Sequence, residues 1–106
     1  MNWKLGPGDH TKTGNGKNHE LYLHPLTQQD YDEAYTWYED KQKGLGERFV
    51  KAVRKKIEEI ILYPEVYGGR SSKKFREAQV EFFPYLIVYK MNKLTKVIYI
   101  SSIHHT

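Results

Sequence analysis

The stretch that decides the fold lies at residues 82–89 and has the sequence Phe82-Phe83-Pro84-Tyr85-Leu86-Ile87-Val88-Tyr89. An apolar run of this length, rich in aromatic and β-branched residues, predicts a buried strand. Pro84 suits its start, because the first residue of a strand needs no ladder hydrogen bond. A second apolar run at residues 96–104 follows a short polar connection at residues 91–95. The two runs therefore predict an antiparallel hairpin near the C-terminus.

Upstream of this hairpin, the sequence predicts a short strand followed by a helix. Residues 20–24 combine two leucines with a tyrosine and predict a strand that Pro25 closes. Thr27 fits a helix N-cap, with Asp30 three residues later as an approximate capping box. The helix is predicted to run to about Lys43. Residues at helical spacing on its inward side are Tyr31, Ala34, Tyr35 and Tyr38.

A second helix is predicted from Leu45 to Tyr63, after Gly44 ends the first helix and before Pro64 ends the second. The short link at Gly44 indicates that the two helices form an antiparallel hairpin. The other faces of the second helix carry mixed charges, which is typical of a solvated surface. Its apolar stripe consists of Leu45, Phe49, Val53, Ile57, Ile60 and Ile61.

The order of these elements predicts an α+β fold. In this fold an N-terminal strand and an antiparallel helical hairpin precede a three-stranded antiparallel sheet, and the helices pack on one face of the sheet. The first strand of that sheet is predicted at residues 75–80, after a basic loop at residues 70–74. Residues 20–106 are expected to form a single domain. Residues 1–19 are rich in glycine and polar side chains and predict a flexible tail.

Composition excludes several classes of site. The 106 residues contain no cysteine, which excludes disulfides, thiolate zinc sites and cysteine nucleophiles. His104 and His105 are adjacent and would point to opposite faces of a strand, so we expect no metal and no cofactor. The chain has neither a membrane-spanning apolar run nor a signal peptide, so a cytoplasmic protein is expected. A net charge of +4 favours acidic or phosphate-rich partners.

The candidate site is a basic surface of the sheet. A cation beside a phosphate and an imidazole that moves a proton are the minimum parts for RNA cleavage by the 2′-hydroxyl. Arg76 and His104 could supply these parts, and we expect them to converge on one concave side of the sheet. Tyr85 and Tyr89 are candidate platforms for unpaired bases. The remaining candidates for nucleic-acid or target binding are the loop cations Arg70, Lys73 and Lys74.

Each of these residues also has a structural interpretation. Arg76 fits an ion pair or a strand edge, and His104 fits an ordinary surface histidine. Tyr85 and Tyr89 fit core aromatics of a buried strand. The residues taken alone leave both interpretations open.

The ordered set of patterns resembles the RelE/ParE superfamily of small bacterial toxins from type II toxin–antitoxin modules. Arg76 followed by residues 83–89 is similar to the family's arginine and its FPY-x-I-x-Y strand, and residues 98–104 resemble the last strand with its terminal histidine. Residues 44–49 resemble the start of the family's second helix. The match to the first strand and helix is carried by Leu21, Tyr22, Leu23, Asp30, Ala34 and Tyr38. Together the resemblance covers residues 20–105.

This resemblance implies a toxin of a plasmid stabilisation or addiction module, which a cognate antitoxin wraps and holds inactive. A homodimer or a toxin–antitoxin hetero-oligomer would be its assembled form. The superfamily divides by target: ParE-like members inhibit DNA gyrase, whereas RelE-like and YoeB-like members cleave mRNA on the ribosome.

Leu86 and His104 favour different branches. Leu86 stands where YoeB-like ribonucleases carry an arginine, and a leucine cannot neutralise a phosphate. ParE-like binding to gyrase or another macromolecular target is therefore the first hypothesis. His104 matches the ribonuclease histidine, so ribosome-dependent mRNA cleavage is the alternative, in which Arg76 neutralises phosphate, His104 acts as general acid or base, and Lys73 and Lys74 hold the RNA backbone. A degenerate, non-toxic family member is a further alternative.

Overall fold

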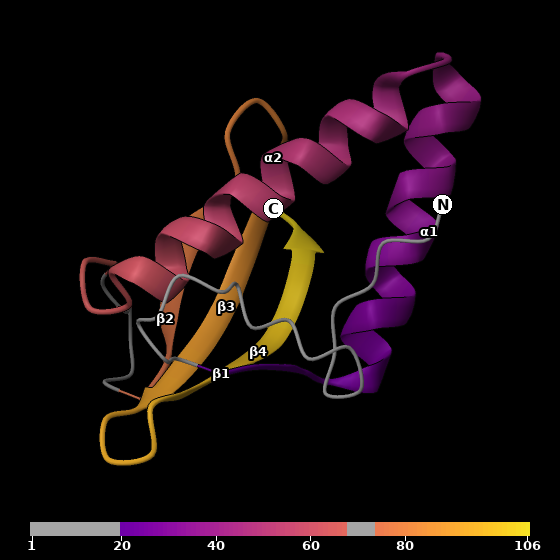
Figure 1. The fold of residues 1–106 in the computed structure, drawn as a ribbon. Helices are drawn as coiled ribbons and strands as arrows, with labels where there is room; N and C mark the ends of the chain where they lie inside the picture. Colours follow the sequence, from indigo (N-terminus) through magenta and orange to yellow (C-terminus); the bar gives the residue numbers. More distant parts are fainter. Residues whose placement is uncertain (1–19, 68–73) are drawn as a thin grey trace.

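A computed structural model describes residues 20–67 and 74–106, which form an α+β fold as predicted (Figure 1). The helices are α1 (Pro25–Lys41) and α2 (Leu45–Leu62). The strands are β1 (Glu20–Leu23), β2 (Arg76–Gln79), β3 (Tyr85–Asn92) and β4 (Val97–His105). The tail expected at residues 1–19 lies outside the described residues, as do residues 68–73, which include all of the basic loop except Lys74. Neither α1 nor α2 is long and apolar enough to cross a bilayer.

The strands form one mixed sheet in the order β1-β4-β3-β2. The antiparallel pairing of β2, β3 and β4 confirms the prediction. The sheet has one strand more than predicted, because β1 joins it in parallel with β4. The helical hairpin carries the chain back across the sheet, so the first strand lies beside the last. Leu21 and Leu23 of β1 lie opposite Ile98 and Ile100, and burial of all four side chains fixes this register.

A β-bulge interrupts the pairing of β3 with β4. Tyr89 lies opposite Ile100, but the preceding residue, Val88, lies opposite Ser102, so Ser101 is an extra residue in β4. The Ser101 hydroxyl donates to the Val88 carbonyl at 3.2 Å. The bulge changes the phase of the inward–outward alternation, and it thereby allows one face of β4 to carry three buried isoleucines, Ile98, Ile100 and Ile103.

Helix α1 begins three residues earlier than predicted, because its N-cap is His24 and not Thr27. His24 is the N-cap, and its Nδ1 accepts a hydrogen bond from the Leu26 amide at 3.1 Å. Pro25 is the first helical residue, where its missing N–H costs nothing and its fixed φ suits the helix. The predicted N-cap role of Thr27 is wrong: Thr27 is buried inside the helix, and its hydroxyl donates to the Ser101 carbonyl at 2.8 Å. This bond attaches the start of α1 to the bulge of β4.

The connection between the helices is tight because two glycines permit it. Gly44 adopts φ 91°, a left-handed conformation that glycine reaches without strain. A Cβ on Gly46 would lie 2.8 Å from the Tyr35 carbonyl oxygen, so only glycine lets the helices approach this closely. The Glu39 carboxylate accepts hydrogen bonds from both glycine amides, at 2.9 and 3.0 Å. The Glu39 side chain of α1 thus holds the connection between the two helices of the predicted hairpin.

The core lies between the helical hairpin and one face of the sheet, with α2 running across the strands in Figure 1. We call this face of the sheet the covered face and the other the open face. The predicted apolar stripe of α2 is buried from Phe49 to Ile61, and Leu45 packs at its margin. The buried sheet residues are Leu21, Leu23, Ala78, Ile87, Tyr89, Ile98, Ile100 and Ile103.

Candidate functional site

Arg76 and His104 lie on opposite faces of the sheet, so the expectation that they converge is wrong. Arg76 is the cross-strand neighbour of Tyr89, and directly opposed residues share a face. His104 is the cross-strand neighbour of Leu86, which is three residues from Tyr89 on the same strand and therefore faces the other way. Arg76 belongs to the covered face and His104 to the open face. One phosphate cannot contact both side chains in this arrangement.

The Arg76 guanidinium binds backbone carbonyls beyond the end of α2. Its Nη1 donates to the carbonyl of Glu65 at 3.2 Å and to that of Tyr67 at 2.5 Å. A half-buried guanidinium that makes charge-assisted bonds of this kind ties the segment after α2 to the sheet. The structural interpretation of Arg76 therefore describes its contacts best.

Tyr89 is completely buried beside Arg76, so its candidate role as a base platform or target contact does not fit this fold. Its hydroxyl donates to the Pro64 carbonyl at 2.7 Å. Burial raises the pKa of Tyr89 to about 12, because the charged phenolate would lose its hydration, and the nearby Arg76 cation opposes this only in part. Arg76 and Tyr89 thus both attach the segment that follows α2 to the sheet.

His104 is exposed on the open face. Its Nδ1 lies 2.9 Å from the Ser102 hydroxyl, and its cross-strand neighbour is Leu86. Leu86 is half-buried and offers no charge to this side of the sheet. Among the described residues, the Ser102 hydroxyl is the side-chain group that orients this imidazole.

Tyr85 belongs to an aromatic cluster at the end of the sheet. Its ring centroid lies 5.0 Å from that of Phe49, 6.2 Å from that of Tyr38 and 5.3 Å from that of His105. Phe83 completes the cluster at 5.1 Å from Tyr38. Burial raises the pKa of Tyr85, but the side chain is only half-buried and can still contact a partner. The structure is therefore compatible with both predicted roles of Tyr85, core aromatic and surface contact.

The predicted loop cations are only partly placed. Lys74 is exposed just before β2. Arg70 and Lys73 lie outside the described residues. The described residues contain no group of three or more His, Asp or Glu side chains that could hold a metal ion.

A basic groove beside α2 was not predicted from the sequence. Arg48, Lys51 and Lys55 line one side of a space of about 520 Å³, and Phe82 and Phe83 line another. The three cations recur at three- and four-residue spacing, which is a visible signal of a common helix side. Nothing in the sequence indicated that the turn before β3 would lie against these cations.

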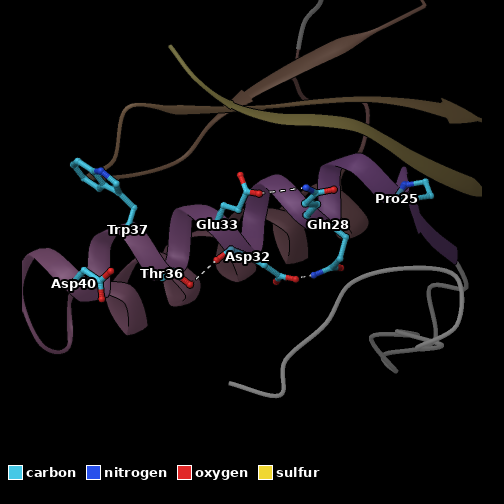
Figure 2. Close-up of a pocket in the computed structure, with 8 residues that line it drawn as sticks. Pro25, Gln28, Asp32, Glu33, Thr36, Trp37 and Asp40 are labelled. Carbon is cyan, nitrogen blue, oxygen red and sulfur yellow. Dashed lines mark hydrogen bonds between the residues drawn. The ribbon is translucent and has the colours of Figure 1, made fainter.

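The outer side of α1 has the opposite charge (Figure 2). Asp32, Glu33 and Asp40 line a shallow surface together with Trp37, a residue that is 56% exposed. Glutamines on the same side of the helix hold two of the carboxylates: Gln28 donates to Asp32 at 3.0 Å, and Gln29 donates to Glu33 at 3.3 Å. The helical hairpin thus presents an acidic outer side on α1 and a basic groove on α2.

Comparison with known proteins identifies a family. A family model described as the ParE toxin of the type II toxin–antitoxin system parDE matches residues 21–106. This range includes both helices and all but the first residue of the sheet described above. A search of curated proteins gives no match.

Proposed function

The chain belongs to the family of ParE toxins of type II toxin–antitoxin systems, and on this premise we propose that it inhibits growth by binding a macromolecular target. DNA gyrase is the first candidate for that target, and the inhibition would take place in the cytoplasm. A cognate antitoxin neutralises the toxin in a hetero-oligomeric complex, and the pair serves plasmid stabilisation.

The observation that carries binding rather than RNA cleavage is the separation of Arg76 from His104. The guanidinium is held on the covered face by the carbonyls of Glu65 and Tyr67, whereas the imidazole lies on the open face beside Leu86. In-line cleavage needs charge stabilisation and proton transfer at the same phosphate. The alternative function, mRNA cleavage by this pair, therefore has no geometric support.

Target contacts are proposed at both ends of the sheet. Tyr85 offers a half-buried ring at the end that carries the aromatic cluster, and Lys74 offers an exposed cation before β2, at the opposite end of the sheet. Arg70 and Lys73 complete this proposed set, although they lie outside the described residues. Aromatic and cationic side chains of this kind are enriched where proteins contact macromolecular partners.

Growth and supercoiling measurements test the proposal. Induced expression of the chain should arrest growth, and co-expression of the protein encoded by the adjacent gene should restore it. Purified toxin should inhibit supercoiling by gyrase, and pre-incubation with the antitoxin should abolish that inhibition. Normal growth on induction would favour the degenerate family member. Gyrase that stays fully active at a large excess of toxin would eliminate gyrase as the target.

Primer extension on translated mRNA addresses the ribonuclease alternative separately. We expect no toxin-dependent cuts. Cuts that appear with the wild-type protein and disappear in both Arg76→Ala and His104→Ala would contradict the binding mechanism, provided that both variants remain folded.

A further inference from the structure

The connection between β3 and β4 presents an exposed leucine on a fixed turn. Leu94 is 94% exposed, although glycine and short polar residues are the usual occupants of such turns. The Asn92 side-chain oxygen accepts hydrogen bonds from the Leu94 and Thr95 amides at 2.9 and 3.1 Å, and the Asn92 carbonyl accepts one from the Lys96 amide at 2.8 Å. In Figure 1 the turn projects beyond the end of the sheet. The backbone of the turn is therefore held without any contribution from the leucine side chain.

The same turn holds a lysine in the left-handed region. Lys96 has φ 62°, a conformation that glycine adopts with less strain. Its side chain is exposed, and within residues 20–67 and 74–106 it has no carboxylate partner. Lys93 is exposed on the other side of Leu94. Packing inside the fold explains none of these three side chains.

A second exposed apolar group lies beside this turn. Lys93 Nζ pairs with a Glu65 carboxylate oxygen at 3.3 Å, which brings the turn against the segment that follows α2. Val66 comes directly after Glu65 and is 70% exposed. Tyr63, whose carbonyl accepts a hydrogen bond from the Val66 amide at 3.1 Å, is 62% exposed. We call the following residues the apolar–basic tip: Tyr63, Val66, Lys93, Leu94 and Lys96.

The charge around the apolar–basic tip is predominantly positive. Lys90 and Lys74 are also exposed at this end of the sheet. The carboxylates here are Glu65 and, at the start of β1, Glu20. The Lys93 and Glu65 side chains are 72% and 52% exposed, so their pairing is weak and Lys93 can exchange Glu65 for another anion. The tip thus combines exposed apolar side chains with cations that a ligand can reach.

We propose that the apolar–basic tip binds anionic lipid bilayers reversibly. Leu94 enters the layer of headgroups, and Lys93 and Lys96 contact lipid phosphates. Insertion removes the Leu94 and Val66 side chains from water, and each lysine adds attraction to the anionic surface. The lysine stems can lie along the apolar layer while the ammonium groups stay among the phosphates. This inference goes beyond the proposed function and does not depend on it.

Nucleic acid is the competing occupant, because its phosphates also attract lysines. The apolar members of the tip favour a bilayer. Leu94 and Val66 are aliphatic, and neither offers a ring on which a base could stack. Leu94 also lies on a projecting turn, where contact with a phosphate backbone would leave its side chain in water. A bilayer satisfies both the cations and the aliphatic side chains of the tip.

Co-sedimentation of the purified full chain with vesicles tests the proposal. Vesicles of phosphatidylcholine and phosphatidylglycerol in equal amounts should bind the chain at least about tenfold more tightly than vesicles of phosphatidylcholine alone. The double variant K93E/K96E should weaken binding to the anionic vesicles at least about tenfold. The matched control K41E/K43E makes the same change in net charge at the connection between α1 and α2, which lies at the opposite end of the molecule in Figure 1. This control should weaken binding less than about threefold, because charges far from the contact are screened.

Substitutions of Leu94 separate insertion from charge attraction. Leu94→Ser should weaken binding about threefold, whereas Leu94→Trp should strengthen it about fivefold, because tryptophan favours the membrane interface. Addition of anionic vesicles should shift the fluorescence of Leu94→Trp to shorter wavelength, and brominated acyl chains should quench it. The wild type, with Trp3 and Trp37, provides the baseline. Both variants should keep the Tm of the wild type, since the side chain at this position is exposed.

Four results would overturn the proposal. Equal losses in K93E/K96E and K41E/K43E would reduce the attraction to net charge alone. An unchanged emission of Leu94→Trp on anionic vesicles would mean that the tip stays outside the bilayer. A labelled DNA duplex that binds the wild type but not K93E/K96E, with no binding to vesicles, would assign the tip to nucleic acid. Loss of growth inhibition by Leu94→Ser, again with no binding to vesicles, would assign it to a protein target. The toxin function stands or falls separately, by the growth and supercoiling measurements.

Discussion

The two faces of the sheet differ in what their side chains are committed to. On the covered face, Arg76 and Tyr89 bind backbone carbonyls that follow α2, and both contribute to the fold. On the open face, His104 and Leu86 are cross-strand neighbours that take no part in the core. Residues that the sequence places in one candidate site thus belong to two different environments. Substitutions on the covered face should therefore lower the free energy of unfolding more than substitutions on the open face.

The largest difference is expected between two adjacent residues of β3. Ile87 is fully buried on the covered face, whereas Leu86 is half-buried on the open face. Ile87→Ala should lower the free energy of unfolding by about 2–5 kcal/mol, because it leaves a cavity in the core. Leu86→Ala should lower the free energy of unfolding by about 1 kcal/mol or less, because removal of a half-buried side chain leaves no enclosed cavity. Urea denaturation measures both, and equal losses would mean that both faces are packed alike.

A smaller effect is expected at high pH from Tyr89. Burial raises its pKa from 10.0 to about 12, so the folded protein keeps this proton after the unfolded chain has lost it. The resulting stabilisation is complete below pH 10 and disappears as the pH rises toward 12, with a loss on the order of 2 kcal/mol.

Urea denaturation at a series of pH values from 8 to about 11 would reveal this effect. Tyr89→Phe has no proton to lose at this position, so its stability should fall less steeply above pH 10 than that of the wild type. Tyr99→Phe, which removes a hydroxyl from the open face, is the control. Identical slopes for the wild type and Tyr89→Phe would contradict the burial of an un-ionised Tyr89.

The smallest expected effect concerns the two candidate catalytic residues. Arg76→Ala removes two hydrogen bonds to backbone carbonyls and should cost about 1–2 kcal/mol. His104→Ala should change the free energy of unfolding by less than about 0.5 kcal/mol, because its side chain is exposed. Growth inhibition by His104→Ala should equal that of the wild type. Loss of toxicity in this stable variant would give the open face a functional role.

The long periodic elements could be predicted from the sequence. The apolar stripe of α2 and the glycine between the two helices are each visible within a short stretch of sequence. The helices that these patterns predict are present in the fold. The start of α1 was less predictable, because Pro25 is compatible both with the end of a strand and with the first turn of a helix. The contact of Thr27 with Ser101 spans 74 positions, so local patterns could not indicate it.

The candidate site was harder to predict, because it depends on which residues share a face. Alternation counted from Ile98 and Ile100 assigns even-numbered residues of β4 to the covered face and would place His104 on the same face as Arg76. The extra residue at Ser101 reverses this assignment. The basic groove depends on a turn that packs against a helix from which it is distant in sequence, and three of its members, Arg48, Lys51 and Lys55, look like ordinary solvated charges until Phe82 is placed opposite them.

The bulge at Ser101 has a consequence for how related genes should be aligned. The two halves of β4 are out of phase, so a homologue that lacks one residue here would still point its terminal imidazole to the open face. A gap therefore belongs at Ser101 or Ser102, where insertion or deletion of one codon changes the length of the strand without moving a side chain from one face to the other. Homologous histidines are best matched by counting back from the end of β4, because a count forward from the preceding turn would be wrong by one position.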